Sequence, residues 1–140
     1  MKGLNVSLAF LCALFALYLF STPVLVAQQS TVFTEQVYLR ISSAYGPEAS
    51  EDVAKWRQLV AELQSENLDE KLYGINRFFN RFDFVDDLVH WQQKDYWATP
   101  IEFISTGAGD CEDYTIAKYF SLIELGIPEQ QLRLMSNALK

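Results

Sequence analysis

The sequence predicts a mostly helical polypeptide after an N-terminal apolar run. Two observations lead to this prediction: apolar residues recur at helical spacing in several segments, and residues that cap helices stand directly before some of them. A third observation limits the size, because 140 residues, 50% of them hydrophobic, suffice for one small globular domain at most.

Residues 1–27 are predicted to be a secretory signal peptide. Lys2 precedes an apolar run from Leu4 to Phe20, and Ala27 stands before a polar stretch, where a signal peptidase would cut. The same run could instead remain as an N-terminal membrane anchor. In both cases residues 28–140 form the domain, outside the cytoplasm. Removal of Lys2 changes the net charge from −7 to −8, which argues against DNA, RNA or an anionic membrane surface as a partner.

Three helices are expected in the first half of this domain. The clearest is Ser50 to Leu63, where Ser50 can cap the helix and the apolar residues lie on one face. Two other segments are also compatible with a helix. The first is Val32 to Ala44, which Gly46-Pro47 ends, and the second is Leu68 to Phe79. The apolar face of the clearest helix consists of Val53, Trp56, Leu59, Val60 and Leu63.

The second half begins with an irregular stretch, Asn80 to Tyr96, rich in aromatic and acidic residues. Thr99 as the N-cap and Pro100 at the first helical position then predict a short helix over Ile101 to Ile104. Ser105 to Gly109 is expected to be a loop.

The last predicted helix runs from Cys111 to Leu125, with Asp110 as its N-cap. Gly126 and Pro128 end it, and the alternation in Gln131 to Met135 predicts a short strand. The expected apolar face of the Cys111 to Leu125 helix consists of Ile116, Tyr119, Phe120 and Ile123.

Cys111 is the only cysteine outside the N-terminal apolar run, and it stands at a helix start among Asp110, Glu112 and Asp113. A cysteine nucleophile acts as a thiolate, which the free N–H groups of a helix N-terminus favour and neighbouring carboxylates disfavour. A divalent cation bound to the acids would change the sign of the local charge and so favour the thiolate. Oxygen ligands such as these suit Ca²⁺ better than Zn²⁺.

Two other interpretations of the same residues stay open. Cys111 could be a small buried residue or could pair with another chain, and the acids could be a solvated helix cap. Consecutive side chains on a helix do not all point one way, so a metal site would need the backbone around Gly107 to Gly109 or another segment to complete it. His90 could act as a general base, but a packing or surface role is more common.

The chain from Trp91 to Met135 resembles the bacterial transglutaminase-like cysteine proteinases, the LapG-type periplasmic proteases. Weaker similarity reaches back to about Phe33. The motifs that carry the resemblance are Lys94 to Pro100, Gly107 to Tyr114, which contains Gly-Asp-Cys-Glu-Asp, Ala117 to Phe120, and Glu124 to Pro128.

The resemblance implies an α+β fold of the papain-like, transglutaminase-like type, of which this chain would hold a truncated, mostly helical N-terminal portion. It makes Cys111 the nucleophile of a Cys-His-Asp triad. Asp110 and Glu112 match the acids that help to bind the Ca²⁺ that these proteases require, and Asp113 is a further candidate ligand. LapG-type enzymes cut a cell-surface adhesin in biofilm control, and an inner-membrane receptor for cyclic-di-GMP holds them inactive. The adhesin and the receptor are therefore the expected partners.

The chain departs from the family pattern at its end. In the family, the histidine and the aspartate follow well downstream of the cysteine, whereas this sequence stops at Lys140, and His90 lies on the wrong side of Cys111. We therefore expect an inactive, truncated form of the protease. The alternatives are a non-catalytic receptor-binding module and a non-functional gene remnant. Without the family's sheet, we also expect the apolar faces of the helices to stay partly in water.

We predict that the purified chain of this sequence does not cleave peptides. A thiol without a base to take its proton, and without a partner to orient that base, is a poor nucleophile. The measurement is an assay on adhesin fragments with Ca²⁺ present. Cleavage that disappears in Cys111→Ala would contradict the prediction and make His90 a candidate base again.

Overall fold

The computed structural model of the protein describes residues 33–133. The predicted signal peptide and the end of the predicted strand, with Met135, lie outside the described residues. Within the described range, none of the helices has the length and apolar character needed to cross a membrane.

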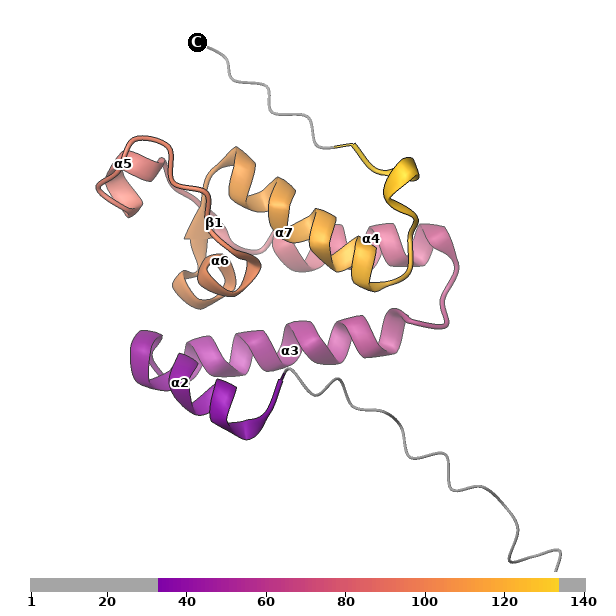
Figure 1. Ribbon diagram of the computed structural model, residues 1–140, viewed down its shortest axis with the longest axis horizontal. Coiled ribbons are helices and arrows are strands. Elements are labelled where there is room, and N and C mark those ends of the chain that lie inside the picture. Colours follow the sequence, from indigo (N-terminus) through magenta and orange to yellow (C-terminus); the bar gives the residue numbers. More distant parts are fainter. Residues whose placement is uncertain (1–32, 134–140) are drawn as a thin grey trace, which may run out of the picture. The chain divides into compact units, whose positions relative to one another are not determined.

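The described part is mostly helical, with one small parallel sheet (Figure 1). Each strand of the sheet has two residues, and Asp83 pairs with Ala108 and Phe84 with Gly109. In chain order the elements are α2 (Glu35–Tyr45), α3 (Pro47–Leu63), α4 (Leu68–Phe79), β1 (Asp83–Phe84), α5 (Asp87–His90), α6 (Pro100–Thr106), β2 (Ala108–Gly109), α7 (Cys111–Glu124) and the 3-10 turn η1 (Glu129–Gln131).

Helix α3 begins one turn before the predicted start. Gly46 has a φ of 98°, a conformation that favours glycine, and Pro47 then occupies the first turn of the helix, where its fixed φ fits and its missing N–H costs nothing. The Ser50 hydroxyl donates to the Pro47 carbonyl at 2.8 Å, so the prediction that Ser50 caps the helix is wrong. Helix α4 has the predicted bounds, and the Asn67 side chain caps it by accepting from the Glu70 N–H.

The segment predicted to be a loop after the short helix is partly regular. Thr99 caps α6 as predicted and forms a capping box with Glu102, but the helix continues to Thr106. Ala108 and Gly109 then form β2 beside β1, which lies in the stretch predicted to be irregular. A strand of two residues is too short to show an alternating pattern, so the sequence could not indicate it.

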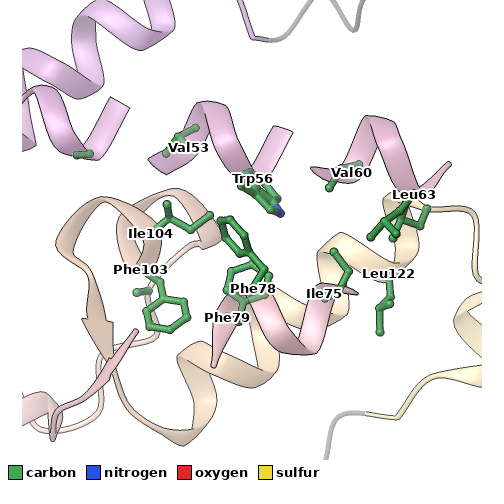
Figure 2. Packing of buried hydrophobic residues seen from close by; sticks show 14 of the residues in the cluster. Val53, Trp56, Val60, Leu63, Ile75, Phe78, Phe79, Phe103, Ile104 and Leu122 are labelled. Atoms are coloured by element: carbon green, nitrogen blue, oxygen red, sulfur yellow. The ribbon is translucent and has the colours of Figure 1, made fainter. Parts of the chain in front are cut away.

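The core lies where α3 packs against α2, α4 and α6, while α7 packs against α4 and α6. Figure 2 shows the apolar face of α3 turned toward side chains of α4, α6 and α7. The expectation that this face stays partly in water is therefore wrong, because the other helices bury it. The labelled buried residues are Val53, Trp56, Val60, Leu63, Ile75, Phe78, Phe79, Phe103, Ile104 and Leu122.

Helix α7 buries a different face from the predicted one. Its buried residues are Asp113, Ala117, Ser121 and Leu122, whereas Phe120 is 53% exposed. Ile116, Tyr119 and Ile123 are only partly buried. The buried face contains two polar residues and a small one, so the apolar pattern of the sequence pointed to the wrong side.

The C-terminal end of the described range also differs in part from the sequence prediction. Gly126, with a φ of 81°, ends α7 as predicted. Gln131 lies in a 3-10 turn, and no strand begins between Gln131 and Arg133 in the described range.

One buried hydrogen bond joins α3 to α7 through the core. The Trp56 indole N–H donates to the Ser121 hydroxyl at 2.9 Å, and that hydroxyl donates to the Ala117 carbonyl at 2.7 Å. Both side chains are at most 5% exposed. Ser121 therefore satisfies a buried indole that would otherwise lose its hydrogen bond to water.

We predict that Ser121→Ala lowers the free energy of unfolding by about 1–3 kcal/mol, the usual cost of a buried donor left without a partner. In a Trp56→Phe background, where no indole N–H remains, the same substitution should cost clearly less. Urea denaturation of the native sequence, the two single variants and the double variant gives the cost of Ser121→Ala in each background. Equal costs of Ser121→Ala in the two backgrounds would show that the hydrogen bond contributes nothing.

Candidate functional site

Cys111 is presented at the first position of α7 by the short sheet that precedes it. Gly107 ends α6 in the left-handed conformation, with a φ of 74°, and β2 then leads directly into the N-cap Asp110. The thiol is exposed and is not part of a disulfide. The alternative that Cys111 is a small buried residue is therefore wrong, and the residue is exposed at the N-terminus of a 14-residue helix.

A capping box fixes the start of this helix. The Asp110 carboxylate accepts a hydrogen bond from the Glu112 N–H at 3.2 Å, and the Asp113 carboxylate accepts one from the Asp110 N–H at 3.3 Å. Cys111 lies between these two acids. The caps therefore fix the backbone on both sides of the thiol.

Asp113 is also a buried link to a second segment. Its side chain is fully buried, and its other oxygen accepts from the Ala98 N–H at 2.7 Å, just before α6. A Cβ on Gly109 would lie 2.5 Å from an Asp113 oxygen and 2.8 Å from a Phe103 ring carbon. Only glycine leaves enough space at this position for the buried carboxylate.

A third carboxylate, which the sequence prediction missed, completes an acidic cluster. Asp87 on α5 is 5% exposed, and oxygen atoms of Asp87, Asp110 and Asp113 lie within 4.8 Å of one another. One Asp87 oxygen accepts from the Tyr96 N–H at 2.6 Å, while the other is buried without a hydrogen-bond partner. Glu112 does not belong to this group of three.

The three carboxylates repel one another and are poorly solvated. Burial, together with the nearby charges of Asp87, Glu112 and Asp113, raises the pKa of Asp110 to about 6. Burial is also the main cause that raises the pKa of Asp113. A divalent cation would neutralise this repulsion and give the free Asp87 oxygen a partner. Three carboxylates with an unsatisfied buried oxygen fit a hard cation such as Ca²⁺.

The other residues singled out from the sequence form no hydrogen bond with the Cys111 side chain in the described range. The His90 ring packs edge-on against Trp91, with 4.6 Å between the ring centroids, and Trp91 packs against Tyr96. Within residues 33–133, no hydrogen bond joins a histidine to the Cys111 sulfur. Trp97 does not belong to this group of packed rings, and it is 62% exposed. The described residues therefore combine a thiol with an acidic cluster, without a hydrogen bond from the thiol to a histidine.

We predict that Asp110→Asn stabilises the protein at pH 7 in the presence of a chelator. Because the folded-state pKa of Asp110 is raised to about 6 from an ordinary 3.8, the folded state binds more protons between these values, and stability is lost as the pH rises through them. Asparagine keeps the helix cap without the charge. The gain should shrink as the pH falls from 7 to 4 in urea denaturation. A loss of stability at pH 7 would contradict the prediction.

Comparisons with known proteins find a family and several solved structures that are similar to this chain. A family described as bacterial transglutaminase-like cysteine proteinase matches residues 43–138. Among solved structures, the calcium-bound form of Legionella pneumophila LapG is similar, with 32% sequence identity over 71% of this chain and a TM-score of 0.58. A second LapG structure and an EGTA-treated form of LapG match with the same identity and TM-score.

These matches extend over only part of the relatives. This chain covers 55% of the calcium-bound LapG chain and 53% of the EGTA-treated one, so it spans about half the length of the LapG structures it matches. The comparison with curated proteins gives no match.

Proposed function

Because this chain belongs to the family of bacterial transglutaminase-like cysteine proteinases, we propose that Cys111 is the nucleophile of a calcium-dependent, LapG-type protease. The fold is α+β and transglutaminase-like, and the described residues form a mostly helical part of it. The observation that carries the proposal is the exposed Cys111 thiol at the start of α7, beside the three-carboxylate cluster.

In the proposed reaction the thiolate of Cys111 attacks the carbonyl carbon of a peptide bond. The tetrahedral adduct expels the amine, which takes up a proton, and leaves a thioester that water hydrolyses. The free N–H groups at the start of α7 favour the negative charge of the thiolate. The triad also requires a histidine and an aspartate, which by resemblance to the family follow the cysteine in the sequence.

Asp87, Asp110 and Asp113 are the residues that we propose hold Ca²⁺, with Glu112 as the further ligand that the family resemblance suggests. When bound, the ion would supply positive charge beside the Cys111 thiol, which would favour its thiolate. The proposal is supported by the clustering of three carboxylates and by the calcium-bound and EGTA-treated structures of the similar LapG.

The substrate, partners and location follow from the family resemblance. We propose a periplasmic enzyme, secreted through the predicted signal peptide, that cuts a cell-surface adhesin and so controls biofilm release. Its proposed regulatory partner is an inner-membrane receptor for cyclic-di-GMP. We propose no nucleic-acid partner, because the strong negative charge of the sequence would repel one.

A second candidate is a non-catalytic module that binds the same receptor. One observation favours it: the described helices bury a core of their own, with α3, α4, α6 and α7 all contributing to it. Such a unit can present a docking surface without cutting a peptide. Calcium-dependent receptor binding without cleavage of the adhesin would support this candidate against the protease.

We predict that the purified chain binds Ca²⁺ and that Asp87→Asn weakens the binding by about tenfold or more, as expected when one charged ligand of a small site is lost. Asp110→Asn and Glu112→Gln are expected to weaken it as well. Isothermal titration with CaCl₂ gives the affinities. Asp69→Asn is the matched control, because it removes an equal charge from α4, outside the cluster. Equal effects of Asp69→Asn and Asp87→Asn would reject the cluster as the site.

We predict that a family-length version, with a histidine and an aspartate supplied downstream of Cys111, cleaves the adhesin. The expected activity disappears with Cys111→Ala and with a chelator, and it returns when Ca²⁺ is added in excess. Gel analysis of the cleaved adhesin measures it. Turnover that a chelator does not affect would refute the calcium assignment while leaving the nucleophile in place.

A further inference from the structure

Lys118 on α7 is a partly buried cation that has no acidic partner among the residues that the structure describes. Its ammonium donates to the side-chain oxygens of Asn76 and Asn80 on α4, at 2.8 and 2.7 Å. Within residues 33–133, the ion pairs involve Lys55, Arg57 and Arg81, and none involves Lys118. An ammonium group has three donors, and these two amide oxygens use two of them. The ammonium also lies 5.6 Å from the centroid of the Tyr114 ring. Its neighbours in the described range are therefore two amides and an aromatic ring, and no carboxylate neutralises its charge.

The same ammonium lies at a groove between α4 and α7, two helices that run side by side (Figure 1). We call this the Lys118 groove. Its volume is about 490 Å³, and Ile75 and Leu122 contribute buried apolar surface to it. Leu72 and Tyr73, on its α4 side, are 40% and 63% exposed. Apolar surface and an ammonium without a carboxylate partner in the described range thus border the same solvent-filled space.

The groove carries a positive charge at one end and a negative charge at the other. Lys118 lies near Asn76. Asp69 lies seven residues before Asn76 on α4, which is about 10 Å along a helix. Asp69 forms no ion pair with Lys118. A ligand of this groove should therefore place a carboxylate at Lys118, apolar atoms against Leu72 and Tyr73, and no second negative charge at Asp69.

We propose that the Lys118 groove binds a segment of another protein in which a single glutamate or aspartate side chain is flanked by apolar residues. A polypeptide fits better than a small carboxylate, because a small ligand would leave the apolar surface of Leu72 and Tyr73 in water. The charge complementarity at Lys118 selects the acid. The groove is formed by α4 and α7 side chains and does not include Cys111 or the acidic cluster.

The environment of Lys118 agrees with this binding. Burial lowers the pKa of its ammonium below the ordinary value, because the charged form is poorly solvated. A carboxylate from a partner would compensate that loss with a charge-assisted hydrogen bond. The two asparagines hold the ammonium in place before the partner arrives, so little side-chain freedom remains to be lost on binding.

The test uses the purified chain and two probes, acetyl-Phe-Glu-Leu-amide and acetyl-Phe-Gln-Leu-amide, followed by two-dimensional NMR of the labelled protein. We expect the glutamate peptide to bind roughly tenfold more tightly than the glutamine peptide, with shifts at Leu72, Lys118 and Leu122. Added NaCl should weaken the binding of the glutamate peptide alone. Equal binding of the two peptides, or shifts confined to other parts of the chain, would overturn the proposal.

Variants separate the role of the charge from that of the fold. Lys118→Met keeps the apolar stem without the charge and should abolish the preference for glutamate, whereas Lys118→Arg should keep it. Lys55→Met, which removes a paired surface charge from α3, should have no effect. If Lys118→Met unfolds, Leu72→Ser at the exposed side of the groove should weaken both peptides. Self-association that Lys118→Met abolishes would show a second copy as the occupant and overturn the partner proposal.

Discussion

The buried carboxylate of Asp113 holds together the chain segments that meet at Cys111. One of its oxygens accepts from the Ala98 N–H before α6, and the other accepts from the Asp110 N–H at the start of α7. Gly109 lacks a side chain and so leaves space for it. Loss of this link would remove the hydrogen bonds that tie the start of α7 to the segment before α6, and would leave the Phe103–Tyr114 ring contact between the two helices.

The buried Asp113 carboxylate also has an electrostatic cost, because it lies beside two other carboxylates. Asp113 lies close to Asp87 and Asp110, and burial with mutual repulsion raises the pKa of Asp110. Hydrogen bonds from backbone N–H groups offset part of this cost, but one buried Asp87 oxygen has no partner. A folded protein tolerates such a cluster when a cation completes it. The rest of the helical core, centred on α3, supplies the stability that the site itself lacks.

The sequence predicted the elements whose signals are local. The bounds of α4 and the cap at Thr99 follow from periodicity and capping chemistry within a few residues. It did not predict the buried face of α7, because Asp113 and Ser121 are buried there through hydrogen bonds to Ala98 and Trp56, which are distant in the sequence. Asp87 was missed for the same reason: its neighbour Asp86 caps α5, and only the packing of α5 near β2 turns Asp87 toward Asp110.

The most direct test of the account is the rate at which iodoacetamide alkylates Cys111, with and without Ca²⁺, located by mass spectrometry of the labelled peptide. If the acidic cluster binds the cation beside Cys111, the added positive charge favours the thiolate, and Ca²⁺ should raise the alkylation rate at pH 7. In Asp87→Asn, where the cluster has lost a ligand, the increase should require more Ca²⁺. An alkylation rate that Ca²⁺ leaves unchanged in the native sequence would contradict the proposed link between the carboxylates and the thiol.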